Sequence, residues 1–398
     1  MTVADRWLLP DGVEEILPNQ ALQVEYLRRQ ILDRYHCWGY DLVIPPLVEF
    51  TDSLLSGTGS DLDLMTFKVT DQISGRMMGI RADITPQTSR MDAHSLRRNG
   101  PSRLCYAGTV LYTKPRYPLA SRSPIQIGVE LYGEAGLAAD IEVISLMVET
   151  LQLAGLNKPQ LDLGHVGIYG NLLEEANLAK EQEEELFDLL QRKSVPELDA
   201  WIASNIKDKA SATMIRALVD LAGDATVLDR AREVFAAAPA EVELALDELQ
   251  AVVDALKASS PDAELYLDLS ELRGYHYHTG VVFAAYAPGV GQAIGNGGRY
   301  DHVGEGFGRS RPATGFNMNL QALVQFGQSQ EYLASGIFVP AVQSSDSENT
   351  AQQKVVIELR AGGERVVCGF PGQQPDYEEL HCDRQLQLVE GAFQVTSV

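Results

Sequence analysis

The sequence predicts an α+β protein: a largely antiparallel sheet flanked by helices, carrying a helical insertion and followed by a small C-terminal α/β domain. Two observations carry this prediction. Strand-like runs with turn residues between them recur from residue 38 to residue 286, whereas residues 171–260 place Leu and Val at helical intervals among abundant Glu and Ala. Because the strand pattern resumes after the insertion, we expect the insertion to lie between two strands of one sheet.

The first predicted element is a helix over residues 20–36, whose apolar residues recur near helical spacing. An extended segment over residues 38–50 follows and is interrupted by two consecutive prolines. Residues 66–80 predict a β-hairpin around Ser74 and Gly75. Further strands are expected in RLCYAGTVLYT (103–113), IQIGVELYG (125–133), QLDLGHVGIY (160–169), ELYLDLS (264–270) and TGVVFAAY (279–286).

The last part of the chain predicts a separate small domain. Residues 341–353 are polar and rich in serine, which is typical of a linker or a flexible loop. The segments KVVIELRAGGERVVCGF and QLQLVEGAFQVTSV then predict a short, strand-rich tail. We therefore expect a core over residues 1–335, and a linker with a small α/β domain over residues 336–398.

Composition argues against several classes of protein. The 32 basic and 55 acidic side chains give a net charge of -23, which repels polyphosphate, so we expect no nucleic-acid partner. No apolar run reaches the length of a membrane helix, and the first residues do not resemble a secretory leader, so we expect a cytoplasmic protein with no membrane contact. The four cysteines lack CxxC spacing, which disfavours a zinc knuckle or a disulfide framework.

Two segments place polar side chains where they could hold a charged small molecule. In RADITPQTSR, Asp83 and Thr85 lie two residues apart, so a carboxylate and a hydroxyl can point to one side and hold an ammonium group. Taken alone, a threonine before a proline is more often the pattern of a helix cap. In QIGVE, Gln126 and Glu130 alternate with Gly128, which leaves room for a ligand; an exposed sheet face would show the same pattern.

The segment ELRGYHYHTG concentrates polar aromatic residues beside an arginine. Arg273 offers a rigid, charged fork for a carboxylate or a phosphate. His276 and His278 could suggest a metal pair, but no further Cys or His cluster completes a tetrahedral shell, so we expect no metal. The glycine-rich GVGQAIGNGGRYD lacks the dinucleotide fingerprint, and the chain has no GxxxxGK[ST], so we expect no cofactor.

Taken in order, these segments resemble those of the histidyl-tRNA synthetases. RADIT stands where that family has RPEGT, RLCYAGTVLY through QIGVELYG resembles class II motif 2, LRGYHYHTG resembles LVRGLDYYTG, and GGRYD through TGFNMNLQAL resembles motif 3. The match covers residues 5–330 and implies a class II aminoacyl-tRNA synthetase-like core. It carries histidine contacts to Asp83, Thr85, Gln126, Glu130, Arg273 and Tyr277, and to His278 where the family has a second tyrosine.

Three positions depart from that family. Its members neutralise the phosphates of ATP with one arginine in motif 2 and one in motif 3, and here Tyr112 and Ala322 stand at those positions. The aromatic residue that stacks on adenine in the family corresponds to Pro124, which has no π face. Because one arginine of this kind is worth about 10³ to 10⁵ in rate in phosphoryl transfer, we expect no useful ligation of histidine.

Synthetase paralogues that keep the amino-acid pocket include the regulatory subunits of ATP phosphoribosyltransferase, which RADITPQ and GYHYHTG resemble. From Lys354 to Val398 the tail carries four basic and seven acidic residues, which favours no tRNA contact. The resemblance implies a non-catalytic subunit, a homodimer within a hetero-octamer, that activates short-form catalytic subunits in histidine biosynthesis and relays inhibition by L-histidine. The alternatives are a divergent histidine–tRNA ligase that grips ATP through other residues, and a synthetase-like paralogue with another partner.

Overall fold

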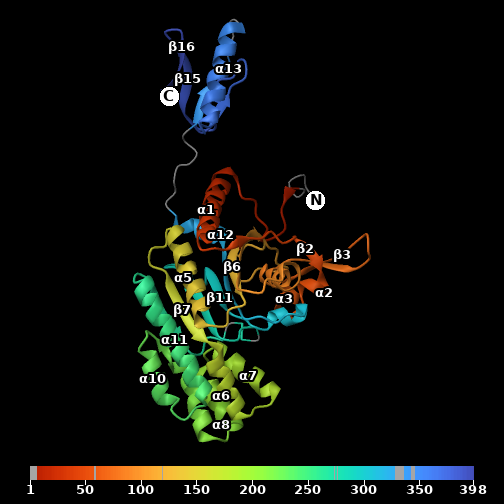
Figure 1. Cartoon of the computed structure of the whole chain (residues 1–398), viewed down its shortest axis with the longest axis vertical. Helices are drawn as coiled ribbons and strands as arrows, with labels where there is room; N and C mark the ends of the chain where they lie inside the picture. Colours follow the sequence, from red (N-terminus) through yellow and green to blue (C-terminus); the bar gives the residue numbers. More distant parts are fainter. Residues whose placement is uncertain are drawn as a thin grey trace. The chain divides into compact units, whose positions relative to one another are not determined.

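The structure is a computed structural model that describes residues 7–57, 60–118, 120–272, 274–275, 277–327, 336–341 and 346–398. Contacts divide the chain into two compact units. Met1–Glu15 and Val24–Gly327 form the larger unit, and Ile16–Gln23 and Gln328–Val398 form the smaller one. The larger unit contains a nine-stranded sheet, and the smaller a four-stranded sheet (Figure 1).

The predicted opening helix and hairpin are both confirmed. Helix α1 (Pro18–Cys37) buries Ile31 and Tyr35 at helical spacing. The extended segment behind it forms two short strands separated by the prolines, and the hairpin strands pair antiparallel, with β2 beside β4 in a three-stranded sheet. The elements of this region are β1 (Asp41–Leu42), β2 (Val48–Phe50), α2 (Thr51–Leu54), α3 (Ser60–Met65), β3 (Phe67–Thr70) and β4 (Met77–Ile80).

The nine-stranded sheet has the order β1-β5-β6-β12-β11-β10-β7-β9-β8. Its pairs are antiparallel except β1 with β5 and β7 with β9, which confirms the prediction of a largely antiparallel sheet. The strands are β5 (Ser102–Thr109), β6 (Ile125–Tyr132), β7 (Gln160–His165), β8 (Ala222–Gly223), β9 (Glu264–Asp268), β10 (Val281–Tyr286), β11 (Gly295–Arg299) and β12 (Ala313–Asn319).

One predicted strand is shorter than expected. The strand predicted over residues 160–169 ends at His165, because the next residues start helix α6. The His165 imidazole accepts the backbone N–H of Gly167 at Nδ1 and so satisfies one of the free donors at the start of the helix. Tertiary packing therefore decided between strand and helix for an apolar run that fits both.

The helical insertion is confirmed. It connects β7 to β9, which are parallel neighbours in the sheet, and a parallel pair requires a long crossover. Figure 1 shows its helices, coloured yellow-green to green, grouped together. They are α6 (Val166–Ala176), α7 (Lys180–Gln191), α8 (Val195–Asn205), α9 (Lys209–Ala217), α10 (Val227–Val234) and α11 (Ala240–Ser259). The two-residue strand β8 within the insertion was not predicted, because two residues show no periodicity.

Three helices outside the insertion lie near the sheet. Helix α5 (Leu137–Leu153) packs against β12 and β6. Helix α4 (Thr85–Arg90) follows β4 and continues into the π-helical segment Met91–Leu96. Helix α12 (Leu320–Leu323) follows β12. Among the helices of the described residues, none is both long enough and apolar enough to cross a bilayer.

The smaller unit has the strand order β14-β13-β15-β16, with β13 parallel to both of its neighbours. Its core contains Ile337, Val339, Val356 and Leu386. Its elements are β13 (Gly336–Val339), α13 (Asp346–Ala361), β14 (Val366–Cys368), β15 (Cys382–Val389) and β16 (Ala392–Ser397). The structure does not describe residues 328–335, so the domain limit expected between residues 335 and 336 stays a prediction.

The prediction of a loop followed by a strand in this unit was wrong for residues 346–361, which form helix α13. Gln352 and Val356, one helical turn apart, are both buried, and Val356 belongs to the core beneath the sheet. The β-branched residues of KVVIELR favour a strand in isolation, but packing against the sheet outweighs that weak preference.

Candidate functional site

Two elements bring four of the predicted site residues together. Strand β6 carries Gln126 and Glu130 on one side, and helix α4 begins at Thr85, two residues after Asp83. The Thr85 hydroxyl donates to Glu130 Oε1 at 2.8 Å, and Gln126 Nε2 donates to Asp83 Oδ1 at 2.9 Å. Gln126 Oε1 also accepts the backbone N–H of Ile84 at 2.9 Å, which connects strand β6 to the start of helix α4. These four residues, Asp83, Thr85, Gln126 and Glu130, are called the cradle.

Glu130 is the acid at the centre of the cradle, and only 1% of its surface is exposed. Thr85 and Tyr106 donate to its Oε1 at 2.8 and 3.0 Å, and the Tyr300 hydroxyl donates to its Oε2. Burial raises the pKa of Glu130 from 4.5 to about 8, because a low-dielectric environment disfavours the carboxylate more than the three hydroxyl donors favour it. At neutral pH the free protein therefore holds a proton here that a cationic ligand would displace.

One carboxylate oxygen of Asp83, Oδ2, is available to a ligand. Its Oδ1 accepts the backbone N–H of Thr85 at 3.1 Å as well as the amide of Gln126. Among the described residues none donates to Oδ2. A carboxylate oxygen that is oriented by its neighbour and has no donor of its own is suited to an ammonium group.

Two alternatives that the sequence left open are wrong. Thr85 is the first residue of α4, but its hydroxyl donates to Glu130 and makes no capping bond. Strand β6 is buried, with Gln126 only 4% exposed, so its polar side is not an exposed sheet face. The polar residues of RADITPQTSR and QIGVE therefore belong to a buried polar network.

Two tyrosines that the sequence did not single out complete this network. Gly128 was expected to leave room for a ligand, but a Cβ there would lie 2.3 Å from the carbonyl oxygen of Phe316 and 2.8 Å from the Tyr106 hydroxyl. The strand register places Tyr106 directly opposite Gly128, so a glycine facing a large residue was the available signal. Tyr300 follows the GGR triplet, and only its contact with Glu130 reveals its role.

Tyr277 and His278 supply an aromatic wall. The Tyr277 ring stacks on the Tyr300 ring with centroids 5.1 Å apart, and the His278 ring meets Tyr277 edge-on at 5.3 Å. The Tyr277 hydroxyl is buried and has no hydrogen-bond partner among the described residues. Because an unpaired buried hydroxyl costs free energy, it marks a place for a polar ligand atom. Arg273 and His276 lie outside the described residues, so the contact predicted for Arg273 stays a prediction.

A cavity of about 1410 Å³ lies in front of these groups. It is wide enough for an amino acid and extends as far as helix α7 of the insertion. Gln126 lines a neighbouring, smaller cavity instead. The large cavity is lined on the cradle side by Asp83, Thr85, Glu130, Tyr277, His278 and Tyr300.

The positions that hold ATP in the synthetases are filled by packing in this chain. Tyr112 is buried and packs in an apolar cluster with Ile84, and the Arg116 guanidinium lies 4.6 Å from the Tyr112 ring centroid. The cavity beside Tyr112 and Pro124 measures about 80 Å³, below the roughly 300 Å³ of ordinary small-molecule sites. Ala322 lies on α12 and supplies no charge. The cavity on this side is therefore small, and Pro124 supplies no ring at the position where the synthetases stack adenine.

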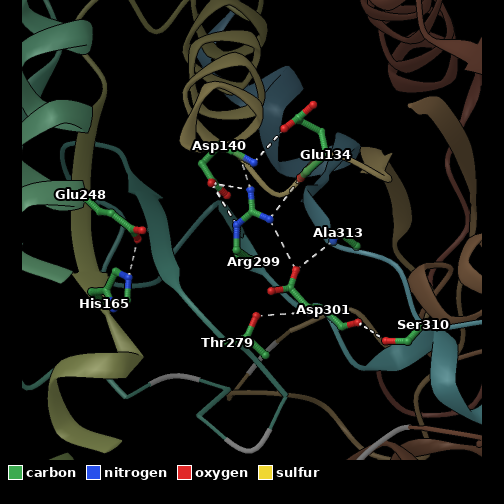
Figure 2. A network of polar contacts seen from close by, with 10 residues as sticks. Glu134, Asp140, His165, Glu248, Thr279, Arg299, Asp301, Ser310 and Ala313 are labelled. Atoms are coloured by element: carbon green, nitrogen blue, oxygen red, sulfur yellow. Dashed lines mark hydrogen bonds and ion pairs between the residues drawn. The ribbon is translucent and has the colours of Figure 1, made fainter. Parts of the chain in front are cut away.

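The two sequence neighbours of Tyr300 belong to a network of polar contacts around the buried pair of Arg299 with Asp140, which Figure 2 shows. Arg299, the preceding residue, donates to Asp140 Oδ2 from Nε at 3.0 Å and from Nη2 at 2.6 Å. Asp301, the following residue, accepts the backbone N–H of Ala313 at 3.0 Å. Because both neighbours of Tyr300 are bonded to other elements, helix α5 and strand β12 fix the hydroxyl that reaches Glu130.

Family models match the two parts of the chain separately. A model described as histidyl-tRNA synthetase matches residues 12–323. A model described as the ATP phosphoribosyltransferase subunit HisZ C-terminal domain matches residues 334–396. Among solved structures, one described as an ATP phosphoribosyltransferase regulatory subunit/histidyl-tRNA synthetase from Bacillus halodurans C is similar, with a TM-score of 0.82 and 26% identity over 94% of this chain and 95% of that chain. The core therefore has the class II synthetase-like fold that the sequence predicted.

Two curated relatives are similar over nearly all of their length. The ATP phosphoribosyltransferase regulatory subunit of Saccharophagus degradans is 56% identical over 386 residues, which is 97% of this chain and 97% of that protein. The protein of the same name from Teredinibacter turnerae is 54% identical over 100% of both chains. With the synthetase-like core, the matching C-terminal domain and these relatives together, the chain belongs to the family of ATP phosphoribosyltransferase regulatory subunits.

Proposed function

We propose that this chain is a non-catalytic subunit that activates short-form catalytic subunits of ATP phosphoribosyltransferase and passes inhibition by L-histidine to them. The observation that carries the proposal is the contrast within one site. Glu130 and Asp83 offer carboxylate acceptors for an ammonium group, whereas apolar packing around Tyr112 occupies the side where a synthetase holds ATP. A site of this kind binds an amino acid without activating it.

The groups of L-histidine match the cavity. Its α-ammonium has acceptors in Asp83 Oδ2 and Glu130, and Gln126 orients Asp83 from behind. Its imidazole can bond to the Tyr277 hydroxyl, with His278 beside it. Its carboxylate is assigned to Arg273 by the resemblance to the synthetases. Together these contacts would give each charge of the zwitterion a partner.

We propose in addition a homodimer of this chain within a hetero-octamer in the cytoplasm, without a nucleic-acid partner. Leu42, Ile44 and Leu47 form a run of large apolar residues that are each at least half exposed, which supports a contact surface near the first strands. The net charge of -23 speaks against tRNA as a partner. Size measurement of this chain alone and mixed with catalytic subunits tests the assembly.

The activity of catalytic ATP phosphoribosyltransferase subunits, measured with and without this chain and titrated with L-histidine, tests the function directly. We expect turnover to rise when the chain is added and to fall again as histidine is added. No change in turnover on addition of the chain would contradict the proposal. Histidine-dependent pyrophosphate exchange by the chain alone would instead favour the divergent ligase.

Asp83→Ala separates binding from activation. We expect weaker inhibition by histidine and unchanged activation in its absence, because the variant removes a proposed ligand contact, and the internal bonds that it also removes, to Gln126 and to the backbone of Thr85, lie within the cradle region. Asp61→Ala is the matched control, since Asp61 lines the same cavity and is not one of the cradle residues. If Asp83→Ala also loses activation, the fold is damaged, and Thr85→Val, which removes only a hydroxyl, then decides.

A further inference from the structure

The segment from Gly274 to His278 places aromatic side chains against two different parts of the molecule. Tyr277 faces the cradle and stacks on Tyr300 at 5.1 Å. Tyr275 faces the helical insertion, where its ring lies 5.0 Å from Tyr169 of α6 and 6.0 Å from Phe187 of α7. One turn of the backbone therefore contacts both the predicted histidine site and two helices of the insertion.

The turn is tightly bonded within itself. The backbone N–H of Tyr275 donates to the carbonyl of Leu272 at 2.9 Å, and those of Tyr277 and His278 both donate to the carbonyl of Gly274 at 2.8 Å. Gly274 has a φ of 69°, a left-handed conformation that favours glycine, and a Cβ there would lie 2.5 Å from the His278 ring. Because Tyr277 is bonded to Gly274, the residue before Tyr275, we expect a displacement of Tyr277 to displace Tyr275 as well.

The contact on the insertion side lies in packed structure. Tyr169 is fully buried in α6, so the ring that meets Tyr275 belongs to the core of the insertion. Phe187 belongs to α7, whose residues Glu181 and Glu184 line the same cavity as the cradle. A shift of Tyr275 therefore has to change the packing between two helices.

We propose that Tyr275 is a positioning residue that passes the occupation of the cradle to helices α6 and α7. The inference rests on the proposed function, since histidine is the ligand that would bond to the free Tyr277 hydroxyl. A ligand shifts an equilibrium only through contacts that differ between two states. Tyr277 supplies such a contact at the cradle, and Tyr275 links it to the insertion.

Amide hydrogen exchange of the full chain, with and without saturating L-histidine, tests this role. In the unaltered chain we expect histidine to slow exchange several-fold in peptides from β6 and also in peptides from α6 and α7. In Tyr275→Leu the slowing in β6 should remain, while that in α6 and α7 should be lost. Tyr275→Phe keeps the ring and should restore the response of both helices.

A second readout uses the reciprocity of coupled binding. Catalytic subunits should change the affinity of the chain for histidine, and coupling between two sites is typically worth about 5- to 150-fold. We expect that ratio to fall close to one in Tyr275→Leu and to stay at the unaltered value in Tyr275→Phe. Should Tyr275→Leu fail to fold, Phe187→Leu tests the same contact from the insertion side.

A control variant breaks a different link between the sheet and the insertion. His165 of β7 bonds to Glu248 of α11 at 2.9 Å, as Figure 2 shows, and Glu248→Ala removes that bond. The control should keep the response of α6 and α7. The proposal is overturned if Tyr275→Leu keeps that response, if Glu248→Ala loses it equally, or if Tyr275→Leu alone no longer binds histidine. Failure of the unaltered chain to bind histidine would contradict the proposed function instead.

Discussion

The two ends of strand β6 differ in what they can bind. Near its last residues, Glu130 lies in a buried network with three hydroxyl donors, and the Tyr277 hydroxyl stays open to a ligand. Just before its first residue, Pro124 and the packed Tyr112 ring leave a cavity of about 80 Å³. The backbone hydrogen bonds that pair β6 with its neighbours do not depend on which side chains stand at these positions. A synthetase-like fold can therefore keep one half of its site and fill the other half.

The sharpest test of this contrast is the ligase reaction itself. We expect histidine-dependent pyrophosphate exchange by this chain to fall at least about 10³-fold below that of a histidyl-tRNA synthetase assayed alongside, because no arginine stands at positions 112 and 322. Exchange at a rate comparable to the synthetase would show that ATP is held through other residues, and the contrast between the two ends of β6 would disappear.

Breaking the ion pair of Arg299 with Asp140, next to Tyr300, should lower the stability of the fold. Asp140→Ala removes the carboxylate that accepts the two shortest bonds of the buried Arg299 guanidinium, so we expect the free energy of unfolding in urea to fall by about 3–5 kcal/mol. Asp52→Ala breaks the exposed pair of Asp52 with Arg76 and should cost less than about 1 kcal/mol. Equal losses in both variants would mean that the Arg299 pair contributes nothing special to the cradle end of the sheet.

A smaller effect separates charge from shape in the cradle. Glu130→Gln keeps the shape of the side chain and removes its charge, so at pH 8 we expect histidine binding to weaken by about 1.5–3 kcal/mol in titration calorimetry. Glu134→Gln is the matched control, since Glu134 follows the same strand and its side chain lies outside the cradle. Unchanged affinity in Glu130→Gln would place the ammonium elsewhere.

The effect that is smallest per pH unit is a dependence of stability on pH. Burial raises the pKa of Glu130 to about 8, so between about pH 4.5 and pH 8 the folded chain holds a proton that the unfolded chain has lost. The free energy of unfolding should therefore decrease as pH rises through this window, by at most about 1.4 kcal/mol per pH unit from this group.

Histidine binding should also depend on the protonation of Glu130. An ammonium beside Glu130 favours the carboxylate, so binding below pH 8 should release a proton, and affinity should rise with pH by at most about tenfold per unit. Calorimetry in two buffers of different ionisation enthalpy measures the released proton. Glu130→Gln should abolish the release, and a release that persists in this variant would assign the proton to another group.

The local sequence pattern was sufficient to predict most of the helices and strands and part of the site. Alternation predicted β6 and the shared side of Gln126 and Glu130, and helical spacing predicted the insertion between β7 and β9. It failed for α13, where a polar, serine-rich start and a β-branched end conceal a helix that only packing on the small sheet selects. It also failed for Tyr106, which reaches Glu130 across a strand pair.

The sequence by itself determined which chemical groups are present: the acids and hydroxyls of the cradle, and a tyrosine, a proline and an alanine where a synthetase contacts ATP. Only the tertiary structure decided which of them meet. The Tyr300 hydroxyl contacts an acid 170 residues earlier in the chain, and Tyr275 and Tyr277, two residues apart, pack against rings from different elements, Tyr169 and Tyr300. Such contacts depend on strand register and helix packing, which set distances between residues that no local pattern relates.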